Sequence, residues 1–186
     1  MAKYFLNLLF PLLFILSKTF STAEGDTFLK SVNRNSLKPR ISHFRFYGHI
    51  IFGGPNATVV NVVPPRVNVK KRSYGLVNMM DIPLTKTPES GSKLLGRVQG
   101  IDGRAWHEKL VQLMAMNIVF FTKKYNGSTL TLLGRNPMSD EVREMPVVGG
   151  SGLFRFARGY LQASTYSVDF QTRDNVIEYI VHVFHY

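Results

Sequence analysis

The residue types most often used for catalysis and metal binding set the first limits on this chain of 186 residues. Cysteine is absent, which excludes disulfides, thiolate nucleophiles and Cys-ligated zinc. No two histidines are spaced four residues apart, as the zinc-binding pair of a helical metalloprotease motif would be. The five histidines are at positions 43, 49, 107, 182 and 185. We therefore expect no metal site, and we expect His49 and His182 to be core or wall residues.

Loops that cradle phosphate or present a nucleophilic serine have recognisable spacings, which this sequence lacks. Residues 149–152 are rich in glycine, but residues 153–156 after them have the pattern of a strand rather than a helix, so we expect a bend. No Gly-x-Ser-x-Gly motif occurs. The basic run at 70–72 is typical of a solvated loop. The sequence therefore predicts neither nucleotide chemistry nor a serine hydrolase.

The N-terminal residues 1–23 have the three parts of a secretory signal peptide: an early positive charge, an apolar run over residues 8–16 and a small-residue ending. The stretch is too short for a membrane anchor, because a spanning helix needs about 20 mostly apolar residues and Lys18 interrupts this one. Residues 24–40 lack periodicity, which favours a flexible leader. We therefore expect export of a chain whose folded domain covers residues 41–186.

The charge and the glycosylation motifs fit an exported protein. The whole chain has a formal net charge of +11, and removal of Lys3 and Lys18 with the signal peptide leaves +9. Because an exported chain seldom meets nucleic acid, we expect this basic surface to bind an acidic polysaccharide. Two Asn-x-Ser/Thr motifs begin at Asn56 and Asn126, and both lie beside turn residues. They predict glycans on the surface.

Short apolar runs between turn residues dominate the rest of the chain, which is typical of an all-β domain. Aromatic residues add to this signal, since the chain has 14 Phe and 8 Tyr. We expect about eight strands, within residues 43–52, 58–63, 73–80, 94–98, 110–121, 129–133, 153–163 and 176–186. The breaks between them, such as Gly-Pro-Asn at 54–56, contain turn formers and no domain boundary.

Two segments indicate how these strands are arranged. Residues 108–121 mix helical and strand periodicity, and their β-branched and aromatic end favours a strand, in keeping with their neighbours. Residues 176–186 carry apolar groups on both faces, with Ile177 on one and Ile180 on the other. An open sheet with one solvated face does not need this. We therefore predict a closed barrel whose outer face is covered by more protein.

Three runs make the chain similar to a known family: Gly-Arg-Val-Gln-Gly at 96–100, Tyr-Asn-Gly-Ser-Thr-Leu at 125–130, and residues 142–160, which contain Arg-Glu-Met-Pro-Val-Val-Gly-Gly-Ser-Gly. They resemble plant dirigent proteins, and the resemblance extends over residues 41–186. It implies an eight-stranded antiparallel β-barrel like that of allene oxide cyclase. It also implies a homotrimer that is secreted to the apoplast or cell wall.

The resemblance implies a function as well. Dirigent proteins steer the coupling of phenoxy radicals, which a separate laccase or peroxidase makes from monolignols such as coniferyl alcohol, so that optically active lignans form. They act by proximity and orientation, and no cofactor is expected. A branch that this chain resembles more closely in its Gly-Pro-Asn and Arg-Glu-Met-Pro features dehydrates isoflavanols to pterocarpans through a quinone methide. We expect stereoselective coupling; the alternatives are a dehydratase and a non-catalytic wall protein that binds phenolics, so enzymatic turnover stays open.

The family's site residues carry over unevenly. The barrel-lining Asp of the family's first strand falls on Ile50, and the Asp of its Gly-Ala-Asp-Pro motif falls on Asn136, so both carboxylates are missing. Arg143 matches the family's pocket Arg, which would hold a phenol oxygen through charge-assisted hydrogen bonds. Because dehydration needs a proton for the departing hydroxyl, the missing acids count more against dehydration than against coupling.

Asp102 replaces the aromatic residue that follows Gly-Arg-Ala-Gln-Gly-Phe in the family. One hypothesis places its carboxyl group at the barrel mouth, with a raised pKa, in partial compensation for the missing acids. The alternative is an Asx turn with Gly103, which the Asp-Gly pair favours. Further residues expected to line the pocket are Phe46, Tyr47, His49, Ile50, Asn136, Phe154, Phe156 and Tyr179.

Overall fold

The computed structural model describes residues 37–65 and 73–186, of which Lys38–Tyr186 form one compact unit. The predicted signal peptide, the predicted leader up to residue 36 and the basic run at 70–72 lie outside the described residues. No helix in the described part is long and apolar enough to cross a membrane. The elements of this part are β1 (Arg40–Ile50), β2 (Val59–Val63), β3 (Val77–Thr85), β4 (Leu94–Arg104), β5 (Val111–Phe120), β6 (Thr129–Pro137), β7 (Val142–Ser151), the 3-10 helix η2 (Gly152–Phe154), β8 (Arg158–Val168) and β9 (Asn175–His185).

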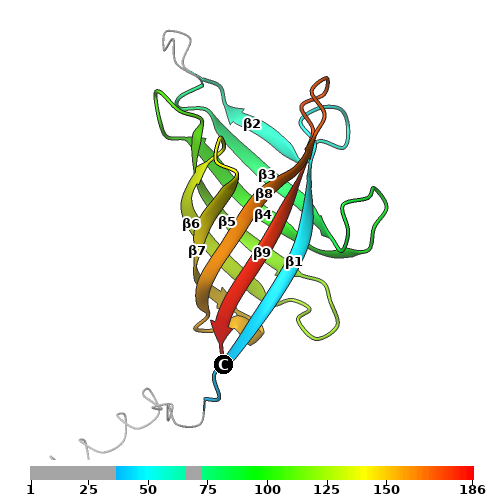
Figure 1. Ribbon diagram of the computed structural model, residues 1–186, viewed down its shortest axis with the longest axis vertical. Helices are drawn as coiled ribbons and strands as arrows, with labels where there is room; N and C mark the ends of the chain where they lie inside the picture. Colours follow the sequence, from blue (N-terminus) through cyan, green and yellow to red (C-terminus); the bar gives the residue numbers. More distant parts are fainter. Residues whose placement is uncertain (1–36, 66–72) are drawn as a thin grey trace, which may run out of the picture. The chain divides into compact units, whose positions relative to one another are not determined.

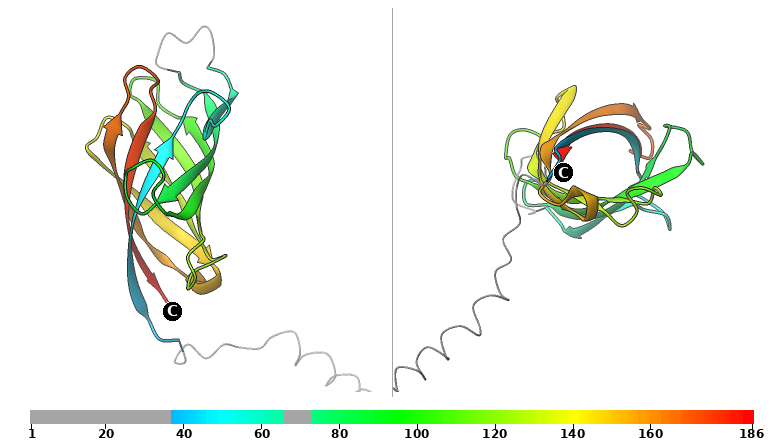
Figure 2. Two further views of the ribbon diagram at one scale, coloured as in Figure 1. Left: turned by 90° about the vertical axis from the view of Figure 1, so that its right-hand side faces the viewer. Right: turned by 90° about the horizontal axis from the view of Figure 1, so that it is seen from below.

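The strands form one antiparallel sheet that closes on itself (Figure 1). Each strand from β2 to β8 pairs with the next along the chain, and β1 pairs with β9 over its whole length. β1 also pairs with β3, where Tyr47 lies opposite Thr85, and this contact completes the wall. Figure 2 shows the strands surrounding the interior when the barrel is viewed from below. The predicted antiparallel barrel is confirmed.

The barrel has eight wall positions although nine strands are present, because β1 and β2 share one position. Both pair with β3, β1 at its C-terminal end and β2 at its N-terminal half, where Val59 lies opposite Met80. The Gly-Pro-Asn turn at 54–56 lies between β1 and β2. One position in the wall is therefore filled by two strands in succession, and the predicted eight-stranded barrel is confirmed. None of the eight runs expected from the sequence covers β7, so the sequence pattern missed this strand.

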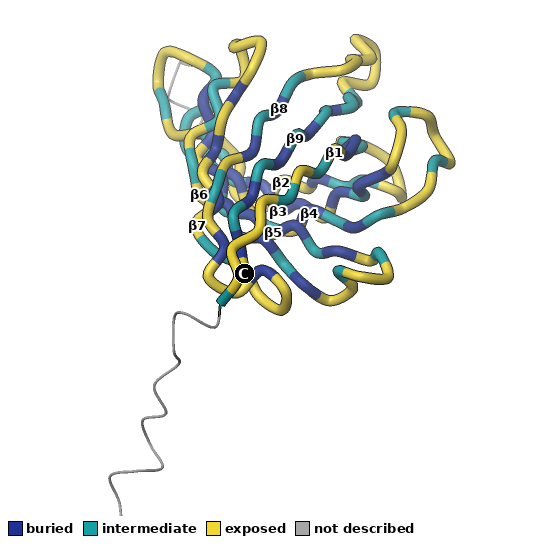
Figure 3. Tube along the Cα trace, turned by 60° about the horizontal axis from the view of Figure 1, so that its bottom comes forward, coloured by how far each residue is buried: buried dark blue, intermediate teal, exposed yellow. Residues whose placement is uncertain are grey.

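Buried and more exposed residues alternate along much of the sheet, as the pleat of a strand requires (Figure 3). On β9, Ile177 and Val181 are buried inside the barrel, while Ile180 and Phe184 lie half-buried on the outer face. β5 shows the same alternation, which confirms that residues 108–121 contain a strand. The interior holds several fully buried side chains, among them Leu84, Val98, Ile118, Leu132, Leu161 and Val181.

An aromatic cluster closes the end of the barrel that lies at the bottom of Figure 1. The rings of Phe120 and Phe154 have centroids 5.0 Å apart, and Phe44 lies 5.1 Å from Phe120. Tyr125 stacks on Phe154 at 5.3 Å, and His185 meets the same ring edge-on. Aromatic pairs at these separations pack tightly and add to the stability gained by burial. Packed aromatic side chains therefore fill this end of the barrel interior.

Strand boundaries differ from the prediction where glycine and proline occur. β6 runs through residues 134–137 and β3 through Pro83, both of which the sequence pattern indicated as breaks. The glycines at 149–150 lie inside β7 rather than in a bend, and η2 replaces the start of the strand expected at 153–163. A Cβ atom at Gly150 would lie 2.5 Å from the Thr129 carbonyl oxygen, so this glycine permits close strand approach rather than a turn.

Candidate functional site

A cavity of about 280 Å³ occupies the end of the barrel opposite the aromatic cluster. Its wall comes from the end of β1, β4, β6 and β8 and from the start of β3, β5, β7 and β9, which antiparallel pairing brings to one rim. Met80, Met114 and Met145 supply much of its apolar lining, with Ile82 and Ile177. Methionine side chains adapt to irregular guests, and their sulfur atoms make favourable contacts with aromatic rings. The cavity therefore suits a flat aromatic molecule.

Asp102 is the one carboxylic acid among the described residues that line this cavity. Its side chain is only 2% exposed, and it accepts hydrogen bonds from Gln112 Nε2 at 2.6 Å and from Asn78 Nδ2 at 3.2 Å to each oxygen. Burial raises the pKa of Asp102, and the hydrogen bonds from Asn78 and Gln112 and the charge of Arg104 oppose that rise. A carboxyl group whose pKa is raised in this way is suited to donate a proton.

The hydrogen bonds of Asp102 continue along the wall. Asn136 Nδ2 donates to Gln112 Oε1 at 2.9 Å, so Asp102, Gln112 and Asn136 form a chain across β4, β5 and β6. Arg104 follows Asp102 on the same face of β4, and its Nη1 donates to Met138 Sδ at 2.7 Å. Burial lowers the pKa of Arg104, although Asp102 counteracts this. This side of the cavity therefore combines an acid with amides and a cation.

Arg143, Thr165 and Tyr179 occupy the wall formed by β7, β8 and β9. The buried Arg143 guanidinium donates from Nε to the Ala163 carbonyl at 3.2 Å and from Nη1 to Thr165 Oγ1 at 2.9 Å. Burial lowers the pKa of Arg143, but an arginine stays charged in proteins. Burial also raises the pKa of Tyr179 to about 12, with the Arg143 charge opposing it. A fixed cation and a neutral phenol thus face the cavity from this wall.

The structure brings five of the predicted site residues to the cavity and leaves five away from it. Arg143, Asp102, Ile50, Asn136 and Tyr179 line the cavity. Asp102 lies within β4, so the Asx turn proposed as its alternative is not formed. The five residues that do not line the cavity are Phe46, Tyr47, His49, Phe154 and Phe156.

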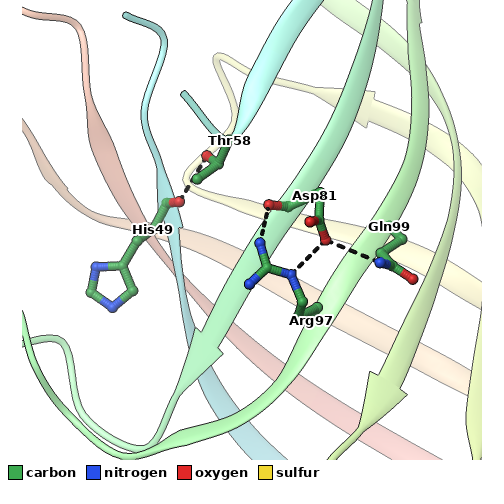
Figure 4. Close-up of polar contacts among 5 residues, drawn as sticks. All are labelled: His49, Thr58, Asp81, Arg97 and Gln99. Carbon is green, nitrogen blue, oxygen red and sulfur yellow. Dashed lines mark hydrogen bonds and ion pairs between the residues drawn. The ribbon is translucent and has the colours of Figure 1, made fainter. Parts of the chain in front are cut away.

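Strand parity explains two of the five displaced residues, Tyr47 and His49, and position along the strand explains Phe46. Phe46 points inward but belongs to the packed core below the cavity. Tyr47 and His49 have the opposite parity: Tyr47 donates to Glu178 Oε1 at 2.9 Å, and His49 Nε2 lies 2.8 Å from Thr85 Oγ1. Burial lowers the pKa of His49. The backbone carbonyl of His49 accepts from Thr58 on the outer face, near the Asp81–Arg97 ion pair (Figure 4).

The two phenylalanines of the 152–157 segment are displaced for a different reason. Phe154 ends η2 and is fully buried in the aromatic cluster at the closed end. Phe156 is 68% exposed, and its backbone has a positive φ of 63°. The prediction treated this segment as a strand that points toward the pocket, whereas it is a turn at the other end of the barrel.

Among the cavity residues that the sequence reasoning missed, three surround Asp102: Asn78, Arg104 and Gln112. Arg104 could have been predicted from the sequence, because it lies two positions after Asp102 on the same strand and therefore on the same face. Asn78 and Gln112 gave no such signal, since they reach Asp102 through pairing with other strands. Asn78 lies opposite Asp102 in register, and Gln112 lies opposite Arg104.

The remaining site predictions concern metals and glycans. Within residues 37–65 and 73–186, no three His, Asp or Glu side chains gather as metal ligands would. His182 lies on the outer face of β9, where its Nδ1 is 2.7 Å from Nδ1 of His43, and His185 is buried inside, so the two histidines lie on opposite faces of the strand. Asn56 and Asn126 are exposed in turns, which leaves both accessible for a glycan.

Fold and site together define a small all-β barrel with one internal site, in which an acid, amides, an arginine and a tyrosine surround an apolar cavity. The family model of the dirigent-like proteins matches residues 41–184. The chain belongs to the dirigent-like family.

Similar proteins come from legumes and from Arabidopsis. Pterocarpan synthase 1 of Glycyrrhiza echinata is 42% identical over 187 residues, covering 98% of this chain and 97% of that protein. Dirigent protein 7 of Arabidopsis thaliana is 40% identical over 189 residues and covers all of both chains. The solved structure of the pterocarpan synthase dirigent protein GePTS1 has a TM-score of 0.75 and 44% identity, over 85% of this chain and 89% of that one.

Proposed function

We propose that the cavity binds one isoflavanol-like phenol and catalyses loss of water through a quinone methide, with ring closure to a pterocarpan. One observation carries this proposal: a buried carboxyl group, Asp102, lies in the cavity wall of a chain that lacks the two carboxylates expected at Ile50 and Asn136. The absence of those acids was the reason to prefer radical coupling, and Asp102 removes that reason. The likeness to a protein named pterocarpan synthase supports the same choice.

In the proposed reaction, Asp102 begins in its protonated form. It donates its proton to the departing hydroxyl group, which leaves as water, while the phenol para to the reacting carbon loses its proton to solvent and the quinone methide forms. A second hydroxyl group of the same molecule then adds to the electrophilic carbon. Its proton returns to Asp102, and the phenol oxygen regains a proton. The net change is the loss of one water molecule, without an oxidant or a hydride acceptor.

The opposite wall would stabilise the charge that develops on the phenol oxygen. The Arg143 guanidinium is held by Ala163 and Thr165 and keeps its positive charge beside the cavity. Donors that are already in place cost no reorganisation when negative charge appears, and they act more strongly in a site from which water is excluded. Tyr179 stays protonated at neutral pH and offers a further donor from the same wall.

The size of the cavity also favours a single guest. Its volume of about 280 Å³ lies just below the range of roughly 300–1,000 Å³ typical of small-molecule sites. Dehydration and ring closure take place within one molecule. Radical coupling requires two phenylpropanoids to meet in a fixed pose, which needs more room.

The second candidate function is stereoselective coupling of monolignol radicals supplied by a laccase or peroxidase. Arg143 favours it, because a guanidinium fixed by two hydrogen bonds can orient a methoxyphenol ring without any proton transfer. The 40% identity to a protein named Dirigent protein 7 is in keeping with this role. A wall protein that binds phenolics without turnover is the third possibility.

Product analysis separates these functions. The purified protein is incubated with an isoflavanol and, separately, with coniferyl alcohol plus a laccase, and the products are resolved by chiral chromatography. We expect one pterocarpan enantiomer from the first reaction, and its loss in Asp102→Asn. An optically active lignan with unchanged isoflavanol would overturn the proposal in favour of coupling. Racemic lignan with unchanged isoflavanol would leave only the binding role.

We also propose that the mature chain is exported to the plant apoplast and retained there by its charge. The charge of +9 that remains after removal of residues 1–23 would attract acidic polysaccharide, and such attraction weakens as salt screens it. Retention on pectin should therefore decrease between low and high salt. Elution that is independent of salt would rule out charge as the cause.

A further inference from the structure

The hydrogen bonds around Asp102 fall into a fixed side and a reversible side. Asn78 makes the fixed side. Its Oδ1 accepts a hydrogen bond from Asn61 Nδ2 at 3.3 Å, and Asn61 is itself anchored by bonds from Nδ2 to the carbonyls of Val63 and Val77 at 2.9 and 3.1 Å. With its oxygen held in this way, Asn78 always turns its amide nitrogen toward Asp102. It can therefore donate to the carboxyl group but cannot accept from it.

Gln112 and Asn136 make the reversible side. Gln112 donates to Asp102 and accepts from Asn136, but Asn136 Oδ1 is buried without any hydrogen-bond partner among the described residues. Among the described residues, the orientation of the Asn136 amide therefore depends on its hydrogen bond to Gln112 alone. An amide rotated by 180° has almost the same shape, with donor and acceptor exchanged. Rotation of both amides would leave the Gln112–Asn136 hydrogen bond intact and reverse its direction.

The contact between Gln112 and Asp102 is a direct one. Its length of 2.6 Å places the two groups within hydrogen-bonding distance, whichever of them donates. The orientation in the structure, with the Gln112 nitrogen toward Asp102, suits an ionised carboxylate. A protonated carboxyl group would instead need an acceptor at this place, and the Gln112 oxygen becomes that acceptor after rotation.

We propose that Asp102, Gln112 and Asn136 form a hydrogen-bonded relay whose direction reverses when Asp102 gains or loses its proton. Gln112 is thus a positioning residue: it donates to the ionised acid and accepts from the protonated acid. Buried polar groups left without a partner are costly, so a group that pairs with both forms keeps both accessible during a proton transfer. The catalytic use of the relay rests on the proposed function, whereas the relay itself does not.

No other ionisable group of the described cavity wall competes with Asp102 in acid solution. The others are Arg104 on the same strand, Arg143 on β7 and Tyr179 on β9. Arginines stay charged, and burial holds the pKa of Tyr179 at about 12. The strands that flank Asp102 contribute Asn78 and Gln112, which do not titrate. A change of the relay between acid and neutral pH therefore reports on Asp102.

Nuclear magnetic resonance tests the relay on the full-length protein without any substrate. We expect the side-chain amide signals of Gln112 and Asn136 to shift with pH, with the same midpoint as the Asp102 carboxyl carbon. In Asp102→Asn, an amide nitrogen faces Gln112 at every pH, so the Asn136 signals should stay at the position that the natural protein reaches in acid. In Gln112→Leu, Asp102 should still titrate while the Asn136 signals no longer respond.

A matched control is available on the outer face of the same sheet. Gln99 Nε2 donates to Asp81 Oδ1 at 3.1 Å, and this exposed Gln–Asp pair does not line the cavity (Figure 4). Gln99→Leu should leave the pH dependence of the Asn136 amide signals unchanged. If the Asn136 signals of the natural protein do not shift with the midpoint of Asp102, the relay is overturned, whatever the variants show. The relay can fail in this way while dehydration is observed, and it can hold while dehydration is absent.

Discussion

Asn78 on β3 lies directly opposite Asp102 on β4, and its amide nitrogen donates to both carboxyl oxygens at 3.2 Å. The acid of the cavity is therefore held by paired strands rather than by a loop. A side chain on a rigid element keeps its direction when surrounding turns move, which is what a proton donor requires. This pair also explains why Asp102 is buried although an Asp-Gly sequence usually occurs in a turn.

Replacement of Asp102 by asparagine should abolish dehydration and preserve the fold. General acid catalysis contributes about 10²- to 10⁴-fold in rate, so kcat for isoflavanol dehydration should decrease by roughly that factor. Guest binding, followed by fluorescence quenching, should change much less. Asp81→Asn is the control, since Asp81 lies on the outer face in the Arg97 ion pair. A full rate in Asp102→Asn would show that another group delivers the proton.

The stability of the protein should depend on pH through Asp102 in a direction opposite to that of an exposed, ion-paired carboxylate. Burial raises the folded-state pKa of Asp102 above its unfolded value of about 3.9, so the folded state binds the proton more tightly. The resulting stabilisation is present below pH 4 and is lost as pH rises through the folded-state pKa. Thermal melting at pH 3.5 and pH 7 should therefore show Asp102→Asn gaining stability relative to the natural protein at the higher pH. An unchanged difference would contradict the raised pKa.

Replacement of Arg143 by leucine should remove the orientation of the guest. Hydrogen bonds to charged groups are each worth about 1.5–3 kcal/mol, so kcat/KM should decrease by about 10- to 100-fold, and the product should become racemic. Arg143→Lys keeps the charge but loses the planar guanidinium group. Its kcat/KM and enantiomeric excess should lie between those of the natural protein and the leucine variant. Chiral chromatography measures the outcome. Full enantiomeric excess in the leucine variant would show that Arg143 does not orient the guest.

The outer face carries an apolar row that should mediate self-association. Val60, Met79, Ile101 and Leu133 lie in register across neighbouring strands, with Ala115 between the last two, and the four larger side chains are 43–49% exposed. Monomeric proteins rarely expose continuous apolar patches of this kind. We expect a homo-oligomer, a trimer by family resemblance, that dissociates in the double variant Ile101→Glu, Leu133→Glu.

Sedimentation velocity would measure this change, with Lys93→Glu in an exposed loop as a charge-matched control. The double variant should sediment as a monomer, and the control should sediment like the natural protein. A natural protein that is already monomeric, or a double variant that stays assembled, would exclude this row as the interface.

Both predicted glycosylation sites should be occupied in protein secreted from plant cells. Asn56 and Asn126 are exposed in turns at the two ends of the barrel wall. Enzymatic deglycosylation should lower the mass in two steps, one of which is missing in Asn56→Gln and the other in Asn126→Gln. No change in mass on treatment would mean that neither motif is used.

The architecture of the barrel was readable from the sequence because burial on both faces of a strand leaves a strong pattern. The alternation of Ile177 with Ile180 on β9 is an example, and it requires only strand parity. The same rule argues against placing Phe46 and Tyr47 in one pocket, because neighbouring residues on a strand point to opposite faces. Parity was therefore informative wherever one strand was considered alone.

The composition of the cavity depends on register between strands, which the sequence does not encode locally. Gln112 meets Asp102 because of the pairing between β4 and β5, and Asn136 meets Gln112 because of the pairing between β5 and β6. Irregular register between Leu84 and Thr85 and between Thr131 and Leu132 shifts such pairings by one residue. One shifted residue moves a side chain to the other face, so the amide chain was beyond prediction.

The pairing of β1 with β9 makes β9 the strand that closes the wall. β1 has eleven register partners on β9 but only two on β3, so nearly all of its main-chain partners lie far later in the chain. During translation, β1 must therefore stay unpaired along most of its edge until β9 has been synthesised. A product truncated before Asn175 would expose that edge, and exposed edges invite pairing with other chains. Each prematurely terminated copy would thus present protein quality control with an open sheet whose unpaired edge is prone to aggregation.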